Sequence, residues 1–117
     1  KDATTGFNNT LIGAFAGENI TDRWANTAVG GEVLRANTNG IQNTALGSEA
    51  LTNALGGSNT AIGADVARHL INGDRNVLIG RETARGETVS YDWDGSDNVV
   101  IGDQAAINFD GTNNRNV

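Results

Sequence analysis

Asn43-Thr-Ala-Leu-Gly47, near the middle of this 117-residue chain, is one copy of the five-residue phrase that decides the fold. The phrase occurs five more times, with small variations, as Asn9-Thr-Leu-Ile-Gly13, Asn26-Thr-Ala-Val-Gly30, Asn59-Thr-Ala-Ile-Gly63, Asn76-Val-Leu-Ile-Gly80 and Asn98-Val-Val-Ile-Gly102. Successive opening asparagines are 17, 17, 16, 17 and 22 residues apart. This period is too short for a pair of helices and suits one coil of a β-solenoid, in which each repeat is stabilised by its neighbours.

We therefore expect an all-β protein, a parallel β-solenoid (β-roll) of about six coils with a period of about 17 residues. Repeats fill nearly all of the chain, so residues 1–117 are expected to form a single repeat domain. Because the chain begins at Lys1 and not at Met, we expect it to be a fragment of a longer fibre.

The composition argues against several classes of partner. The chain has 14 acidic and 8 basic residues, a formal net charge of −6, and the basic residues are spread singly. This balance repels phosphate backbones and anionic lipid, so we expect neither nucleic acid nor a membrane as a partner. No cysteine is present, which excludes a disulfide framework, and the 16 glycines recur at regular offsets as turn residues do.

The alternation of side chains along a strand assigns the two faces of each phrase. The second and fourth residues are β-branched or aliphatic, so we expect them to face inward and form the core. The third residue is apolar too, but a narrow coil encloses only one face, so we expect this position to contact sister subunits of a homotrimer. The residues predicted at this trimer interface are Leu11, Ala28, Ala45, Ala61, Leu78 and Val100. The alternative is a weakly apolar free surface.

The remainder of each repeat predicts the other side of the coil. Two apolar residues after the closing glycine, as in Val33-Leu34, predict a second strand-like side. A glycine three residues before the next asparagine, as at Gly40 and Gly56, predicts a turn with positive φ. The stacked asparagines predict a ladder of hydrogen bonds, to one another or to turn backbone.

The phrase Asn-Thr-Ala-(Ile/Val/Leu)-Gly, followed within a few residues by Ala-Leu or Val-Leu, resembles the repeats of phage tail fibres and similar trimeric virion appendages. It is also similar to the Ser-Val-Ala-Ile-Gly phrase in the heads of trimeric autotransporter adhesins, which form a left-handed parallel β-roll. The resemblance covers Asn9 to about Ala106. It implies a trimeric extracellular fibre on a virion or a bacterial cell surface. The period here is longer than in the adhesin heads, which favours the phage-type arrays.

A mostly acidic column occupies the second position after the closing glycine. Its members are Phe15, Glu32, Glu49, Asp65, Glu82 and Gln104. Carboxylates at strand spacing, about 4.8 Å, repel one another unless they are solvated, neutralised or bound to metal. Since Arg35, Arg68 and Arg85 follow three residues later, we expect an exposed stripe balanced by arginines. A cation-binding column is the alternative.

The fifth repeat is the longest, and its excess falls within residues 86–97. It carries Tyr91 and Trp93 beside Asp92 and Asp94. Aromatics next to carboxylates on a loop of a rigid scaffold suit sugar rings, so we expect these residues to bind a ligand; packing on a neighbouring protomer is the alternative. Asp92, Asp94 and Asp97 also resemble a short calcium loop, which is a second possible cation site beside the acidic column. We otherwise expect the chain to need no cofactor.

A second irregularity precedes Trp24, where Arg23 replaces the expected turn glycine. Trp24 has two interpretations, a ligand-contacting aromatic or a plug over the end of the stack. Catalysis finds little support, because His69 is the only histidine and neither a cysteine nor a recognisable nucleophile or phosphate motif is present. We therefore expect no enzymatic activity, although paired carboxylates keep open a glycosidase.

These features predict a structural and adhesive segment of a trimeric extracellular fibre or phage virion appendage, with a rigid shaft and irregular loops that recognise host-surface glycan. Its partners would be copies of itself, adjacent fibre or virion segments, and glycan. The alternatives are the head of a bacterial trimeric autotransporter adhesin and a carbohydrate-active solenoid enzyme. An ice-binding surface is a further class, suggested by a threonine column at Thr10, Thr27, Thr44 and Thr60. The expected burial of that column argues against it.

Overall fold

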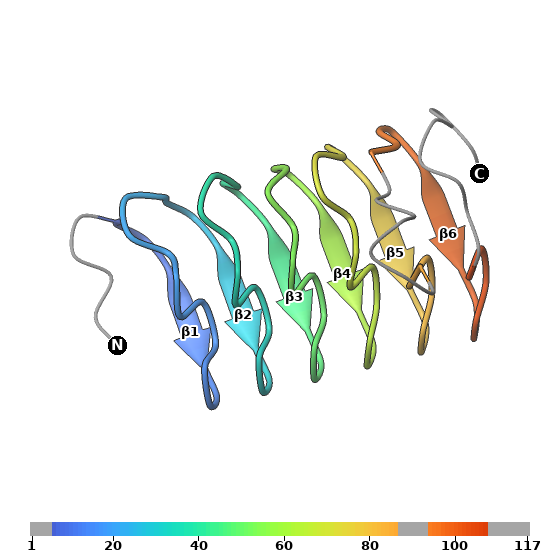
Figure 1. The fold of residues 1–117 in the computed structure, drawn as a ribbon, viewed down its shortest axis with the longest axis horizontal. Coiled ribbons are helices and arrows are strands. Elements are labelled where there is room, and N and C mark those ends of the chain that lie inside the picture. Colours follow the sequence, from blue (N-terminus) through green and yellow to red (C-terminus); the bar gives the residue numbers. More distant parts are fainter. Residues whose placement is uncertain (1–5, 87–93, 108–117) are drawn as a thin grey trace.

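The fold is one parallel β-sheet wound as a β-solenoid. The computed structural model describes residues 6–86 and 94–107. Its strands are β1 (Thr10–Ile12), β2 (Thr27–Val29), β3 (Thr44–Leu46), β4 (Thr60–Ile62), β5 (Val77–Ile79) and β6 (Val99–Ile101). They form a six-stranded sheet in the order β1-β2-β3-β4-β5-β6, so each strand pairs with the next along the chain, as Figure 1 shows. The predicted all-β solenoid is confirmed.

The register of the sheet follows the repeats. Thr27 pairs with Thr44, and Thr44 pairs with Thr60 although that interval is one residue shorter. Val77 pairs with Val99 across the 22-residue interval. Differences in repeat length are therefore absorbed outside the strands, while the strands stay in register and follow one another along the long axis of the molecule (Figure 1).

The opening asparagines form a buried hydrogen-bonded ladder inside the stack. Asn43 Oδ1 accepts the backbone N–H of Asn59 at 2.9 Å, and Asn43 Nδ2 donates to the Gly56 carbonyl at 2.9 Å. The same two bonds are made by Asn9, Asn26, Asn59 and Asn76 to the repeats that follow them. Each buried amide thus satisfies two backbone groups of the next repeat, which confirms the predicted ladder.

The strands present the opposite face inward from the one predicted. Ala28, Ala45, Ala61 and Leu78, at the third position, are fully buried within the single chain. They cannot contact sister subunits, so the predicted trimer interface is wrong. The two remaining members of that set, at the ends of the array, are partly buried against the same core: Leu11 and Val100.

The asparagine explains this reversal. Its side chain must face inward to reach the turn backbone, and strand alternation then carries the third residue inward with it. The interior is narrow, which suits Ala at this position in β2, β3 and β4. The larger fourth-position residues face outward, and Ile12, Ile62 and Ile101 are 58%, 37% and 66% exposed.

The other side of the core is built by turns and not by the predicted second strand. Glu32 and Leu34 have φ angles of 55° and 50°, in the left-handed region that an extended strand excludes. Val33 and Leu34 are nevertheless fully buried, and the Leu34 N–H donates to the Ala50 carbonyl at 3.1 Å. These turns therefore stack repeat on repeat as the strands do.

Glycines meet two different needs in the coil. Gly47, which closes its phrase, has a φ of 127°, and a Cβ built there would overlap the carbonyl of Gly63. A positive φ was predicted for Gly40 and Gly56, but neither residue has one. Glycine is required for a steric reason instead, since a Cβ on Gly40 would overlap the Gly56 carbonyl. The positive φ falls instead on the residue before the asparagine, as at Gln42 with 58°.

The ladder predicts a large cost for Asn59→Ala. This change leaves the buried N–H of Asn76 and the Gly73 carbonyl without their side-chain partners, which we expect to lower the free energy of unfolding by about 3 kcal/mol. Urea denaturation measures the change. Asn53→Ala is the control, because the Asn53 side chain makes no hydrogen bond within the described residues and should cost less than about 0.5 kcal/mol. Equal losses in the two variants would contradict the ladder.

The closing glycines give a second prediction, which compares two neighbouring turn positions. Gly47→Ala places a Cβ against the Gly63 carbonyl at a φ that L residues rarely adopt, and we expect a loss of about 3 kcal/mol. Gly31→Ala should be nearly neutral, because the nearest atom to its added Cβ is Ser48 Oγ at 4.0 Å. Melting temperatures of the two variants, measured side by side, test the difference; similar values would refute it.

Candidate functional site

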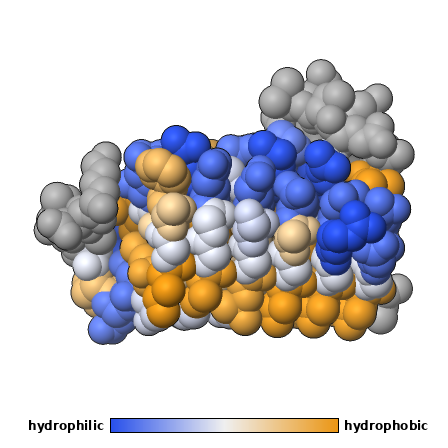
Figure 2. Space-filling view, turned by 90° about the horizontal axis from the view of Figure 1, so that it is seen from below, coloured by the Kyte–Doolittle hydropathy of each residue, from blue (hydrophilic) through white to orange (hydrophobic). Residues whose placement is uncertain are grey.

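The outer face of the sheet is an uncharged strip, which we call the outer strip. It consists of the outward side chains of the six strands, Thr10, Ile12, Thr27, Val29, Thr44, Leu46, Thr60, Ile62, Val77, Ile79, Val99 and Ile101. Every one of them is at least partly accessible to solvent. Figure 2 shows an apolar band that runs along the length of the stack beside a polar one. Sequence reasoning placed these residues in the core and so missed this surface.

The acidic column lies on the turns that follow the strands and is balanced by arginines. Arg35 contacts Glu18 at 2.9 Å and Glu32 at 3.0 Å. Arg68 contacts Glu49, one repeat earlier, at 3.0 Å, and Asp65 at a longer 3.6 Å. This pattern matches the predicted balanced stripe. The side chains are 29–42% exposed, so each pair contributes at most about 1 kcal/mol.

The two ends of the column are the neutral residues Phe15 and Gln104, which contact Arg35 and Glu82 respectively. Arg35 lies over the Phe15 ring, with its guanidinium carbon 5.0 Å from the ring centroid. Its hydrogen bonds to Glu18 and then to Glu32 raise the pKa of the Arg35 guanidinium above its ordinary value. At the other end, Gln104 Nε2 donates to Glu82 at 2.9 Å. The column is thus neutralised by protein groups along its length.

The predicted calcium and sugar-binding residues are only partly described. Tyr91, Asp92 and Trp93 lie outside the described residues. Asp94 Oδ1 accepts the Asn72 backbone N–H at 3.1 Å, and Asp97 forms a bidentate pair with Arg75 at 2.6 and 2.9 Å. That pair raises the pKa of the Arg75 guanidinium.

The donor set of the predicted calcium loop is therefore already occupied in part by protein groups. A cation at Asp97 would have to compete with Arg75 for both carboxylate oxygens. Within residues 6–86 and 94–107, no group of three or more His, Cys, Asp or Glu side chains converges on a position for a metal ion.

Trp24 packs against the preceding repeat. Its ring stacks on Phe7 with centroids 6.0 Å apart and planes 3° from parallel. Trp24 is half-buried, whereas Phe7 is 59% exposed. One face of the indole is therefore occupied by protein, and ligand contact through its remaining surface stays a prediction.

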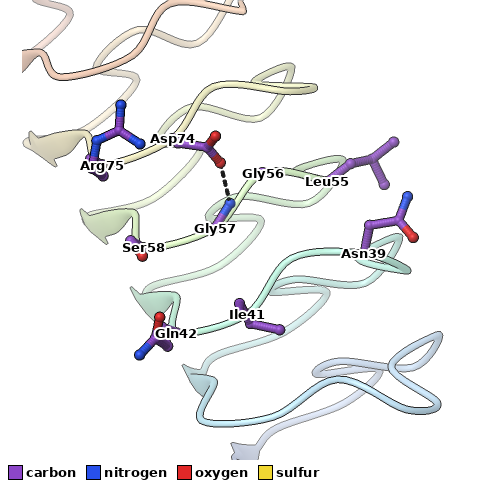
Figure 3. Close-up of a pocket in the computed structure, with 9 residues that line it drawn as sticks. All are labelled: Asn39, Ile41, Gln42, Leu55, Gly56, Gly57, Ser58, Asp74 and Arg75. Carbon is purple, nitrogen blue, oxygen red and sulfur yellow. Dashed lines mark hydrogen bonds between the residues drawn. The ribbon is translucent and has the colours of Figure 1, made fainter.

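The structure has a surface hollow that sequence reasoning did not find. It lies in a column of equivalent residues whose first two members are Phe7 and Trp24. The column is formed by the residues two before each opening asparagine, and in the shortest repeat this residue is Gly57. The hollow opens there, between Ile41 and Asp74, and Figure 3 shows the side chains that line it. We call it the Gly57 notch. The available signal was the glycine itself, at a position where every other repeat carries a side chain.

Comparison with known proteins adds no assignment: no protein-family model, curated protein or solved structure matches this chain. In the part of the chain that the structure describes, no helix has the length and apolar character needed to cross a bilayer.

Proposed function

We propose that the chain is a structural and adhesive segment of a trimeric extracellular fibre or phage virion appendage. The observation that carries this proposal is the outer strip, an uncharged and solvent-accessible face that runs along all six strands. The in-register sheet and the buried asparagine ladder support the shaft, because they make a stiff stack whose length grows with the number of repeats.

The outer strip suits self-association because of its composition and its period. Large aliphatic side chains such as Ile12 and Ile101 are more than half exposed, which costs free energy in a protein that stays monomeric. The side chains of the strip repeat at strand spacing, about 4.8 Å. Another copy of the same stack would match this spacing over the whole strip. Three copies around a common axis would bury all three strips, and the arrays that this sequence resembles are likewise trimeric.

Recognition of a host surface is proposed for the irregular parts of the array. Tyr91, Asp92, Trp93 and Asp94 belong to the longest repeat, and Trp24 to the irregular first one. Aromatic and carboxylate groups of this kind suit glycan rings through stacking and hydrogen bonding. Copies of the chain, adjacent fibre segments and host glycan are thus its proposed partners, at a virion or bacterial cell surface.

Two related functions remain as alternatives. The head of a bacterial trimeric autotransporter adhesin would use the same stack and the same strip, and a membrane-anchor domain in the complete gene would identify it. A carbohydrate-active solenoid enzyme would instead cleave polysaccharide, which a reducing-sugar assay measures directly. Calcium at Asp92, Asp94 and Asp97 is compatible with each of these functions, but it would have to displace Arg75 from Asp97.

One observation favours a function of another class, ice binding. The threonine column faces outward, contrary to the sequence expectation: Thr10, Thr27, Thr44 and Thr60. Hydroxyl and methyl groups repeated at about 4.8 Å on a rigid sheet can order water in a regular array. Val77 and Val99 replace threonine in the last two strands, which shortens the hydroxyl column. Ice binding also needs the strip to be uncovered. A monomer that shows thermal hysteresis would therefore favour ice binding over the fibre.

The oligomeric state tests the proposed interface. Ile62 is 37% exposed on β4, and Ile62→Lys would place a charge in the middle of the buried strips. We expect the wild-type chain to sediment as a trimer and Ile62→Lys as a monomer with unchanged circular dichroism. Ala64→Lys adds the same charge at an exposed position beyond the strand and should remain trimeric. A wild-type monomer at every concentration, or trimeric Ile62→Lys, would overturn the interface.

The recognition loop is tested separately. We expect Trp93→Ala to abolish binding to host cells while leaving the trimer intact, because it removes a large aromatic contact surface. Flow cytometry with labelled protein measures the binding, and sedimentation measures the assembly. Unchanged binding by an intact Trp93→Ala trimer would exclude this residue from recognition.

A further inference from the structure

The Gly57 notch arises where one side chain is missing from a column. Ile41, Gly57 and Asp74 occupy equivalent positions in successive repeats, each two residues before the opening asparagine. A Cβ on Gly57 would lie 2.8 Å from the Ile41 carbonyl oxygen, so the backbone packing itself requires glycine here. The result is a hollow of about 360 Å³ with Ile41 on one side and Asp74 on the other (Figure 3).

The rim of the notch carries hydrogen-bonding groups from three successive repeats. Gln42, Ser58 and Arg75, each directly before an asparagine, have φ angles of 58°, 59° and 56° and line the same hollow. The side chains of Gln42 and Ser58 make no hydrogen bond to any described residue. The rim therefore presents an amide and a hydroxyl, each of which both donates and accepts.

The charged members of the rim are held in place by protein contacts. Asp74 Oδ1 accepts the Gly57 N–H at 2.7 Å, drawn in Figure 3, which leaves Asp74 Oδ2 as an acceptor. Arg75 is fixed by its bidentate pair with Asp97, which engages Nε and Nη2 and leaves Nη1 as a donor. These contacts orient the groups before any ligand arrives, which reduces the entropic cost of binding.

We propose that the Gly57 notch binds a neutral sugar ring. The apolar groups of Ile41 and Leu55 suit the C–H face of a pyranose, and the amide, hydroxyl and carboxylate of the rim suit its hydroxyls. The volume is at the small end of ligand sites, about 300–1,000 Å³, which fits one or two rings. Two carboxylates, Asp74 and Asp97, against one guanidinium disfavour anionic sugars.

The inference rests on the proposed adhesive function, for which it names a ligand class and a second recognition site. Because the notch is open to solvent, we expect weak binding, with a dissociation constant of about 1 mM. A trimer would carry three copies of the notch, and simultaneous engagement of a glycan surface multiplies such affinities by about 100-fold or more.

Backbone and side-chain amide shifts in ¹⁵N-labelled protein test the site directly. The probes are D-mannose, D-galactose and N-acetyl-D-glucosamine, with 3′-sialyllactose as the anionic comparison, each titrated to about 20 mM so that a 1 mM site is saturated. We expect at least one neutral sugar to shift the Gly57 N–H and the Gln42 side-chain amide, and to do so at lower concentration than sialyllactose.

Matched variants then separate the notch from general surface binding. Gln42→Ala should weaken the interaction at least five-fold, and so should Asp74→Asn, which keeps an oxygen for the Gly57 N–H but removes the charge. Gln104→Ala is the control, since Gln104 is also an exposed glutamine with a positive φ, 53°, on the turn at the opposite end of its strand. It should bind as the wild type does.

Three results would overturn the inference. They are the absence of shifts at Gly57 and Gln42 with every neutral sugar, equal weakening by Gln104→Ala, and tighter binding of sialyllactose. None of these results contradicts the proposed fibre as long as the wild-type chain is trimeric. Conversely, a monomeric chain that still binds a neutral sugar at the notch would refute the fibre and keep the site.

Discussion

The hydrogen bonds of the buried asparagine amides are the constraint on which the rest of this structure depends. Each amide from Asn26 to Asn76 joins two backbone groups about one coil further along the chain, one just before a strand and one in the turn that precedes it, as Asn43 does with Asn59 and Gly56. Such groups, shut off from water, are costly to leave unpaired, so the repeats must stack in a single register. The same amides determine which side of every strand faces inward.

That inward assignment decides where function can lie. Among the described residues the interior is filled by alanines, by the stacked amides and by aliphatic residues of the turns. The outer strip is left with aliphatic and threonine side chains in solvent, while the charged column beside it is neutralised within the chain. Association along the strip and recognition at irregular positions are therefore the two functions that we propose for this architecture.

Irregular repeats create the candidate sites because the sheet does not adjust to them. The 16-residue and 22-residue intervals leave the pairing of β3 with β4 and of β5 with β6 unchanged. The missing or additional residues must then be accommodated outside the strands. The Gly57 notch lies in the short repeat, at the position where glycine replaces the side chain of the other repeats, because the backbone of Gly57 approaches the Ile41 carbonyl too closely for any side chain.

The sequence by itself determined the repeat, the parallel in-register sheet, the asparagine ladder and the balanced acidic column, because each follows from equivalent residues that recur once per repeat. The tertiary structure alone decided the faces of the strands. In Asn43-Thr-Ala-Leu-Gly47 both alternating sets contain apolar residues, so local hydrophobicity is ambiguous, and only the reach of the asparagine amide to the turn backbone resolves it. It also decided that Glu32 and Leu34 turn instead of extending, since nothing in either side chain signals a positive φ.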